Sequence, residues 1–175
     1  MSTPPFERLV ERHGHELFVY LFRMLREAPE AEDCLQETFL RAFRAHGRLD
    51  GNANHRAWLY RIATNVALTH LKRRGREAAR SVELQPELHD SADGRDPSES
   101  AERNELLASV AAAVEGLPPK QRAALVLHHY QRLSYAEIAS TLGCSTDAAR
   151  ANVHQALKKL REKLKPAEPT EEAST

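Results

Sequence analysis

The sequence predicts an all-α fold of two small helical domains joined by a flexible acidic linker. Apolar residues recur at three- and four-residue steps along most of the chain, and no alternating run of β-branched residues predicts a strand. These steps are lost over residues 75–96, where Pro86 and Gly94 interrupt an acidic stretch. We therefore expect a first domain over residues 1–76, a linker over 77–97, a second domain over 98–165 and a disordered tail over 166–175.

The charge of the chain is distributed unevenly, although 25 basic and 25 acidic side chains give a formal net charge of zero. Residues 1–80 carry 14 basic and 10 acidic side chains, and residues 106–165 carry 9 and 4. Residues 81–105 carry 2 basic and 8 acidic side chains, and the tail carries 3 acidic ones. Two basic blocks separated by an acidic one are compatible with nucleic-acid binding, which the whole-chain charge conceals.

Composition argues against membrane proteins and secreted proteins. No apolar run approaches the roughly 20 residues that span a bilayer, and the N-terminus lacks the basic and apolar regions of a secretory signal. The two cysteines, Cys34 and Cys144, lie far apart within helical patterns, which is typical of a reducing compartment. We expect a cytoplasmic protein with no direct membrane insertion.

Three helices are expected in the first domain. The first carries one apolar stripe from Phe6 to Leu25, and the Ala-Pro-Glu sequence at 28–30 breaks it. The second is expected over about 30–46 and the third over about 54–73, with Gly75 ending the third. The second helix has acidic residues before basic ones, which favours the helix dipole, but its acid-rimmed apolar face also suits protein docking.

The third helix has a strongly basic end that suits single-stranded or melting DNA. Seven basic residues and one acidic residue lie between Arg56 and Arg80. Trp58, Tyr60 and Asn65 are interleaved with them, and aromatic and amide groups among basic ones suit unpaired bases. The alternative for Trp58 is a place in the hydrophobic core.

Four helices are expected in the second domain. Asp96, Pro97 and Glu99 have the types found at the cap, first and third positions of a helix, which Gly116 would end. A Pro-Pro pair at 118–119 opens the next helix.

The last two expected helices form a helix-turn-helix. Ser134 and Glu137 form a capping box, Gly143 provides the turn, and Ser145 caps a helix that runs to about Lys165. Arginine, asparagine and glutamine side chains on that helix can contact bases, and its N-terminus can meet a phosphate. The candidate DNA-binding residues are Ser145, Arg150, Asn152, His154, Gln155, Lys158 and Lys159. The alternative is a helical hairpin with a solvated basic face.

Four segments of the chain resemble bacterial sigma factors of the extracytoplasmic-function (ECF) group. Residues 31–42 resemble that group's polymerase-gripping segment, and residues 57–65 resemble its segment for the promoter −10 element. Residues 117–122 and 133–139 resemble its C-terminal domain, which reads the −35 element. The order is the same, and the resemblance covers nearly residues 6–165. The two expected domains would then be sigma region 2, with three to four helices, and sigma region 4, with four.

The resemblance implies a transcription initiation factor without catalytic residues, metal or cofactor. Its partners would be core RNA polymerase (β′ and β), promoter DNA and an anti-sigma factor, and the free protein would be a monomer. The loop at 47–54 would hold a flipped base, and the acidic linker would thread the polymerase channel. The polymerase-binding residues would be Asp33, Gln36, Glu37 and Phe39. With the basic end of the third helix, the −10 residues would be Arg56, Arg61, Asn65, Lys72, Arg73 and Arg74.

The chain departs from the group's pattern at several positions. Ala149 stands where a bulkier residue is usual, Thr69 where Asp is common, and Asn152 and Gln155 where Arg is frequent. These departures affect which −35 sequence the protein is expected to recognise and which DNA phosphates it is expected to contact. Less charge on the last helix predicts a shallower salt dependence of DNA binding, which Asn152→Arg should steepen.

Three other classes of protein compete with this interpretation. A conventional helix-turn-helix regulator would bind duplex DNA alone, usually as a dimer. A metal enzyme is suggested by His128-His129 and the histidines at 13 and 15, but adjacent helical residues point about 100° apart and no H-E-x-x-H is present. A pure interaction protein would hold its basic faces against an acidic partner.

Overall fold

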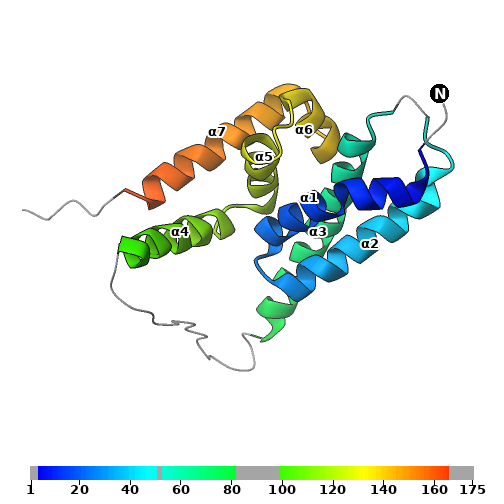
Figure 1. Ribbon diagram of the computed structural model, residues 1–175. Coiled ribbons are helices and arrows are strands. Elements are labelled where there is room, and N and C mark those ends of the chain that lie inside the picture. The colour runs from blue at the N-terminus through cyan, green and yellow to red at the C-terminus, as the bar shows by residue number, and fades with distance from the viewer. Residues whose placement is uncertain (1–3, 51–52, 82–98, 166–175) are drawn as a thin grey trace, which may run out of the picture.

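The computed structural model describes residues 4–50, 53–81 and 99–165, which fold into helices without a strand (Figure 1). This confirms the predicted all-α class. The helices are α1 (Phe6–Leu25), α2 (Ala28–His46), α3 (His55–Ser81), α4 (Glu99–Glu115), α5 (Pro119–His129), α6 (Tyr135–Leu142) and α7 (Thr146–Lys163). None of the helices in these ranges is long and apolar enough to cross a membrane.

Helices α1, α2 and α3 form an N-terminal module around large buried side chains. Tyr20 and Tyr60 are fully buried with their rings edge to face, 5.3 Å between centroids. The Tyr20 hydroxyl lies 2.7 Å from the Thr64 hydroxyl, so this polar pair is satisfied inside the core. The other large, fully buried side chains of the module are Leu17, Leu21, Met24, Leu25 and Leu59.

Two helix boundaries differ from the expected ones. Helix α2 begins at Ala28, because Pro29 fits the first turn, where its missing N–H is not needed. Helix α3 continues through Gly75 to Ser81, so the expectation that Gly75 ends it is wrong. Gly75 lacks the positive φ of a helix-ending glycine, and the residues that follow it are good helix formers. The expected cap at 96–97 and the tail lie outside the described residues.

The C-terminal module is α4 to α7, and the predicted caps at the start of α6, the end of α6 and the start of α7 are confirmed. The Ser134 hydroxyl accepts a bond from the Glu137 amide, and the Glu137 carboxylate accepts one of 2.8 Å from the Ser134 amide. Gly143 ends α6 in the left-handed conformation with φ 63°, and Ser145 caps α7 by accepting from the Ala148 amide at 3.1 Å. These contacts build the predicted helix-turn-helix.

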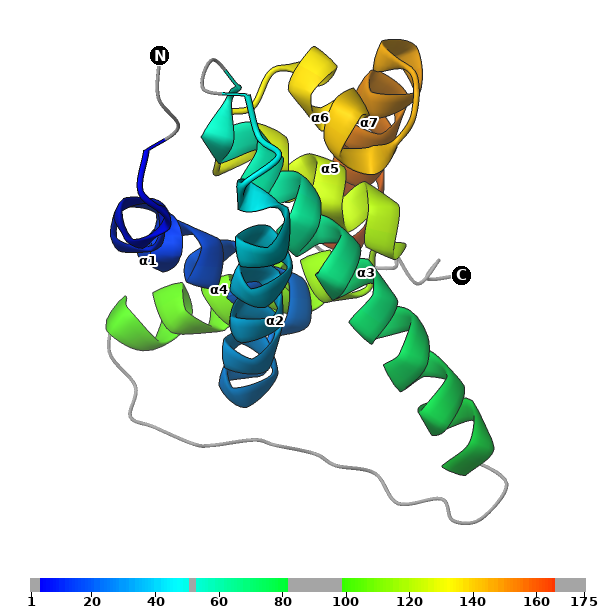
Figure 2. The same cartoon turned by 90° about the vertical axis from the view of Figure 1, so that its right-hand side faces the viewer.

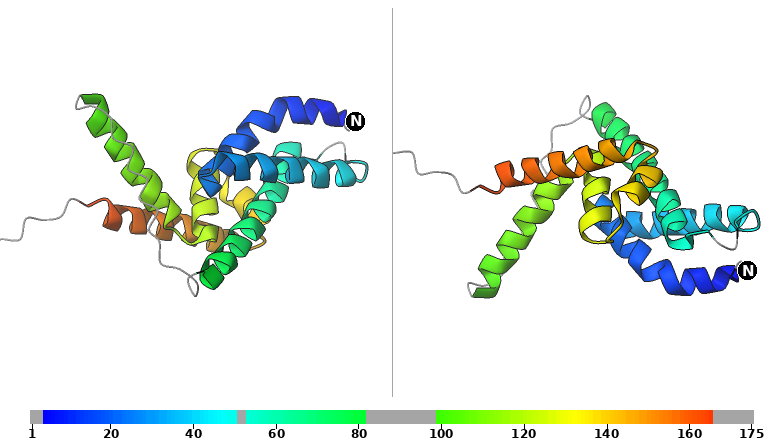
Figure 3. Two further views of the ribbon diagram at one scale, coloured as in Figure 1. Left: turned by 90° about the horizontal axis from the view of Figure 1, so that it is seen from below. Right: turned by 90° about the horizontal axis from the view of Figure 1, so that it is seen from above.

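The two modules pack against each other, and most of the expected linker at 77–97 lies outside the described residues. Helix α5 packs on α1 and α3, and α6 packs on α3 (Figure 2). One cluster of buried apolar side chains includes Leu21 and Met24 of α1 and Val126 and Leu127 of α5. Helix α4 diverges from this body, packing chiefly on α7 (Figure 3). The described residues therefore form one compact body with α4 projecting from it.

Candidate nucleic-acid and polymerase interfaces

The exposed face of α2 carries an apolar hollow that contains two of the predicted polymerase-binding residues. Gln36 and Phe39 line it together with Phe6, Leu40 and Phe43. Leu40 is 52% exposed and Phe43 is 62% exposed, although both are large and apolar. The Phe6 ring packs edge-on against Phe39 and Phe43, with centroid distances of 6.2 and 5.3 Å. Sequence reasoning missed Leu40 and Phe43. The available signal was that Leu40 lies four residues after Gln36 and Phe43 lies four residues after Phe39.

The other two predicted polymerase-binding residues lie on the neighbouring side of α2. Asp33 and Glu37 line a groove between α2 and α3, opposite Arg73. Glu37 accepts a 2.6 Å hydrogen bond from Arg41, one turn later on the same helix. The helix therefore presents an apolar surface with an acidic edge. Such a composition suits a protein interface with a charged rim.

The basic end of α3 separates into residues that face solvent and one that does not. Arg61, Asn65 and Lys72 are exposed and share one face, since steps of four and seven residues return to nearly the same side of a helix. Arg73 is also exposed. Arg74 instead donates to the Leu25 carbonyl at 3.2 Å and to Glu30 at 2.9 Å. Arg74 thus fastens α3 to the α1–α2 corner.

Arg56 lies at the other end of α3 and is also engaged within the protein. It donates to Glu16 at 2.9 and 3.0 Å and to the backbone carbonyl of Gln131 at 3.0 Å. Burial raises the pKa of Glu16, but hydrogen bonds from Arg56, His13 and Tyr60 and the charge of Arg56 outweigh it and hold that pKa below its ordinary value. Glu16 therefore stays ionised, and the guanidinium is paired rather than free.

Trp58 packs partly buried against the core cluster, so its core alternative is confirmed. Tyr60, two residues later, is fully buried, so its ring is not open as a stacking platform. The aromatic residues of α3 thus belong to the fold, and the exposed basic face lies farther along the helix.

The recognition helix α7 presents most of its predicted DNA-binding residues on one open face. Ser145, Arg150, His154, Gln155 and Lys158 are exposed. The Arg150 guanidinium lies 5.3 Å from the Tyr135 ring centroid, and Gln155 accepts a 2.8 Å hydrogen bond from Gln121. These contacts orient the two side chains without covering them.

Two predicted residues of α7 are poorly placed for that face. Asn152 and Lys159 are half-buried. At about 100° per residue, Asn152 points about 160° away from His154. The presence of Asn at position 152, where the ECF group often has Arg, therefore affects base recognition less than the sequence analysis predicted.

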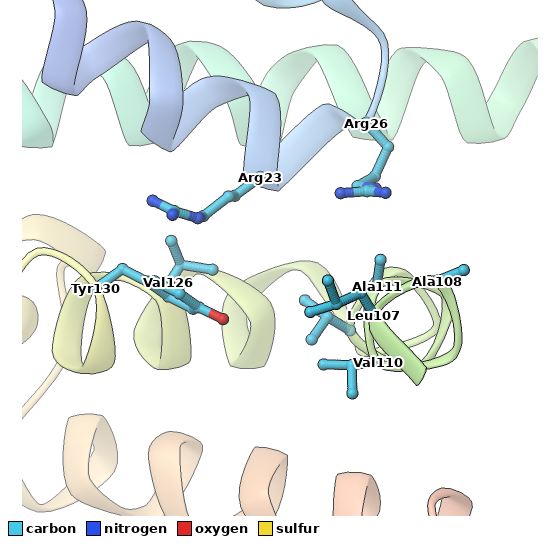
Figure 4. Close-up of a pocket in the computed structure, with 9 residues that line it drawn as sticks. Arg23, Arg26, Leu107, Ala108, Val110, Ala111, Val126 and Tyr130 are labelled. Carbon is cyan, nitrogen blue, oxygen red and sulfur yellow. The ribbon is translucent and has the colours of Figure 1, made fainter. Parts of the chain in front are cut away.

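A separate apolar hollow lies where the two modules meet (Figure 4). Its volume is about 350 Å³, and α1, α4 and α5 supply its lining. Arg23 and Arg26 form a basic rim on the α1 side, across from Leu107 and Tyr130. The Arg23 guanidinium lies 4.1 Å from the Tyr130 ring centroid, which is cation–π distance.

Comparison with known proteins identifies the family. Residues 9–77 match the protein family described as Sigma-70 region 2. Residues 107–160 match the family described as Sigma-70, region 4. The RNA polymerase sigma-H factor of Pseudomonas aeruginosa is 33% identical, over 92% of this chain and 86% of that protein. The chain belongs to the ECF sigma factors. It is thus a transcription initiation factor, and the resemblance stated from the sequence is confirmed.

Other relatives extend this assignment. The ECF RNA polymerase sigma factor SigE of Mycolicibacterium smegmatis is 35% identical over 93% of this chain, which spans 63% of that longer protein. The fold matches the sigma factor RpoE of Bartonella quintana, solved in complex with the anti-sigma factor NepR, with a TM-score of 0.71. That match covers 93% of this chain and 98% of RpoE at 24% sequence identity. In this ECF sigma factor, the two family matches fall on the N-terminal and C-terminal modules.

Proposed function

We propose that this ECF sigma factor binds core RNA polymerase through α2, opens the promoter −10 element on the exposed face of α3, and binds the duplex −35 element with α7. The observation that carries the proposal is the open face of α7, which follows a helix-turn-helix turn and has a capped N-terminus. A helix presented in this way fits the major groove, where Arg150 and Gln155 suit base edges and Lys158 suits a phosphate.

The α2 surface supports polymerase binding because a contiguous patch of exposed large apolar side chains is unusual on a monomer. Phe39, Leu40 and Phe43 would supply the apolar contact with the β′ subunit, and Asp33 and Glu37 would supply its acidic edge. We place the β subunit against the C-terminal module. This arrangement makes polymerase the platform on which both modules bind.

The exposed face of α3 supports binding of the −10 element. Arg61 and Lys72 would contact phosphates, and Asn65 lies between them with an amide that can pair with an unstacked base. The base-holding role of the loop at 47–54 remains a prediction, since residues 51 and 52 lie outside the described part of the chain.

Run-off transcription tests the function. Core polymerase plus this protein should yield a specific transcript from a fragment carrying the upstream region of its own gene, and core polymerase alone should not. Arg61→Ala combined with Lys72→Ala should reduce the transcript about tenfold, because two phosphate contacts are lost. Arg8→Ala combined with Arg12→Ala, which removes two exposed basic residues of α1, is the matched control. A protein that footprints duplex DNA as a dimer without polymerase would instead be a conventional regulator.

An anti-sigma partner is part of the proposal. The hollow of Figure 4 is lined by both modules, so a ligand there touches both at once. Its apolar floor and its rim of Arg23 and Arg26 suit an amphipathic helix with acidic side chains. The RpoE structure, a complex with an anti-sigma factor, is consistent with such a partner for a chain of this fold.

Neighbouring leucines of α4 offer a matched test of this site. Leu107 lines the hollow, while Leu106 does not, and they are 58% and 61% exposed. Leu107→Arg should raise transcription from the protein's own promoter in cells without changing run-off transcription in vitro, and Leu106→Arg should do neither. Equal effects of the two substitutions in cells would count against this site.

A further inference from the structure

His128, in the last turn of α5, contacts the first residue of α6. Its imidazole ring stacks on the Tyr135 ring, with 4.6 Å between the centroids and 19° between the planes. Its Nδ1 lies 3.2 Å from the Leu133 carbonyl oxygen and donates to it, because a carbonyl oxygen can only accept. The adjacent His129 meets the His128 ring edge-on at 5.3 Å and is exposed. Of the histidine pair noted in the sequence, the first is therefore held against an aromatic ring.

The Tyr135 ring also contacts a residue assigned to base recognition. The Arg150 guanidinium lies over this ring, 5.3 Å from its centroid, which is within the range of a cation–π contact. Tyr135 packs partly buried against the hydrophobic core, whereas Arg150 is exposed. One anchored ring thus links the end of α5 to the open face of α7.

Helix caps fix the backbone positions of both partners. Tyr135 is the first residue of α6 and follows Ser134, whose hydroxyl caps that helix. Helix α7 follows Ser145, whose hydroxyl caps it in the same way, and Arg150 lies just beyond its first turn. Regular helices hold functional side chains more precisely than loops do. The helix-turn-helix itself therefore sets the separation between the ring and the guanidinium.

An ion pair is a weaker competitor for the position of Arg150. The Asp147 carboxylate lies 3.6 Å from the guanidinium, but the two side chains are 94% and 54% exposed. Exposed ion pairs of this kind contribute little and are screened by salt. We therefore expect the ring of Tyr135, and not the carboxylate of Asp147, to orient the guanidinium.

A pre-oriented arginine discriminates between base pairs better than a free one. An arginine side chain loses rotamer freedom when it binds a base, and this loss opposes binding. A guanidinium that a ring already holds has lost part of that freedom before DNA arrives. The benefit is realised only where both hydrogen bonds to a base can form, so it favours the correct base pair over the others.

We propose that Tyr135, supported by His128, is a specificity-determining positioning residue that holds Arg150 ready to read one base pair of the −35 element. The Tyr135 ring acts through the arginine and needs no contact of its own with a base. This role rests on the assignment of α7 to the −35 element under the proposed function, and it adds two residues of α5 and α6 to that interface.

Binding of holoenzyme to duplex probes tests this role. The probes carry the −35 element of the protein's own promoter with each base pair replaced in turn, and Arg150→Ala identifies the base pair that Arg150 reads. Tyr135→Leu should reduce discrimination at that same base pair about threefold, as expected for the loss of an exposed cation–π contact. Tyr135→Phe keeps the ring and should discriminate as the wild type does. An equal loss for the two substitutions would assign the effect to the hydroxyl and overturn the proposal.

The effect should vanish when the arginine is absent. Tyr135→Leu added to Arg150→Ala should cause no further loss of discrimination, because an interaction energy requires both partners. The same loss in both backgrounds would contradict a positioning role. Asp147→Asn removes the exposed ion pair and is the matched control, which should leave discrimination unchanged. A threefold loss in this control would show that the carboxylate, and not the ring, orients Arg150.

Substitution of His128 provides a second test that leaves Tyr135 in place. His128→Leu keeps an apolar side chain against Tyr135 but removes the stacked ring, and it should reduce discrimination at the same base pair about twofold. Melting curves show whether each free variant is folded. Unchanged discrimination by folded His128→Leu would overturn the support that His128 gives. Holoenzyme binding that does not depend on the −35 sequence even in the wild type would instead overturn the proposed function itself.

Discussion

The N-terminal module buries two tyrosines and a methionine, whereas the apolar residues buried in the described C-terminal module are all aliphatic, and nearly half of them are alanines. Tyr20, Leu21 and Met24 are completely buried in the first. Alanines make up much of the second core: Ala123, Ala124, Ala139, Ala149 and Ala156. Hydrophobic stabilisation grows with the apolar area removed from water, so the second module gains less from its own core. Packing of α5 on the first module buries further apolar area. The C-terminal module therefore depends on the N-terminal module for part of its stability.

Arg122 should give the largest effect, because it anchors the weaker module to the stronger one. Its buried guanidinium donates to the carbonyls of Met24, Glu115 and Leu117. Arg122→Ala leaves those buried acceptors without their donor and should lower the free energy of unfolding by about 3 kcal/mol. Urea unfolding measures this, with the exposed Arg161→Ala as control. An unchanged midpoint would mean that the module boundary contributes little stability.

Acid should weaken the N-terminal module through Glu16, which pairs with Arg56 of the same module. Its pKa is lowered in the folded protein, so its ion pair with Arg56 gives stability that is complete above the ordinary pKa of glutamate, near 4.5. That stability is lost as the pH falls through the lowered value. In thermal melts between pH 7 and 3, the melting temperature of the wild type should fall more steeply with decreasing pH than that of Glu16→Gln. Parallel curves for the two proteins would argue against this role.

Two glycines should respond to alanine with opposite signs. Gly143 has φ 63°, and an added Cβ there meets no atom within 4 Å, so Gly143→Ala should lose about 1 kcal/mol through backbone strain alone. Gly75 lies within α3 and also has free space, so Gly75→Ala should gain about 0.5–1 kcal/mol. Thermal denaturation measures both. A loss at Gly75 would contradict its place inside a regular helix.

The smallest effect is expected on the open face of α7. Lys158→Ala should weaken −35 duplex binding by holoenzyme similarly for all sequences and lower the salt slope by about 1. Arg150→Ala should instead reduce discrimination between sequences. Binding titrations at several salt concentrations separate the two. Because Asn152 points away from this face, Asn152→Arg should now change the slope less than Lys158→Ala does.

Local signals in the sequence predicted helix ends well and module contacts poorly. Ser134, Gly143 and Ser145 act on backbone groups within four residues, so their roles are visible in sequence. Gly75 was misinterpreted because composition does not distinguish a glycine that needs positive φ from one that tolerates a helix. Contacts such as Arg56 with Gln131 join residues far apart along the chain, and no periodicity marks them.

The same limit applies to the candidate sites. Arg61, Asn65 and Lys72, assigned to the −10 element from the resemblance, lie on one exposed face because they belong to one helix. The sequence could not distinguish Arg73 from Arg74, although one step of about 100° sends the first to solvent and the second to Glu30. A charged residue next to a tertiary partner looks the same in sequence as one facing DNA.

Helix α5 has six consecutive buried residues, from Arg122 to Leu127, so this part of the helix exposes no side to water. Separation of the modules exposes the side of α5 that faces α1 and α3 to water. Hydration of this apolar surface is unfavourable unless another protein surface covers it. Free chains should accordingly spend little time separated and should seldom scan DNA on their own. The abundance of unoccupied core enzyme, more than that of promoters, would then set how many copies are ready to initiate.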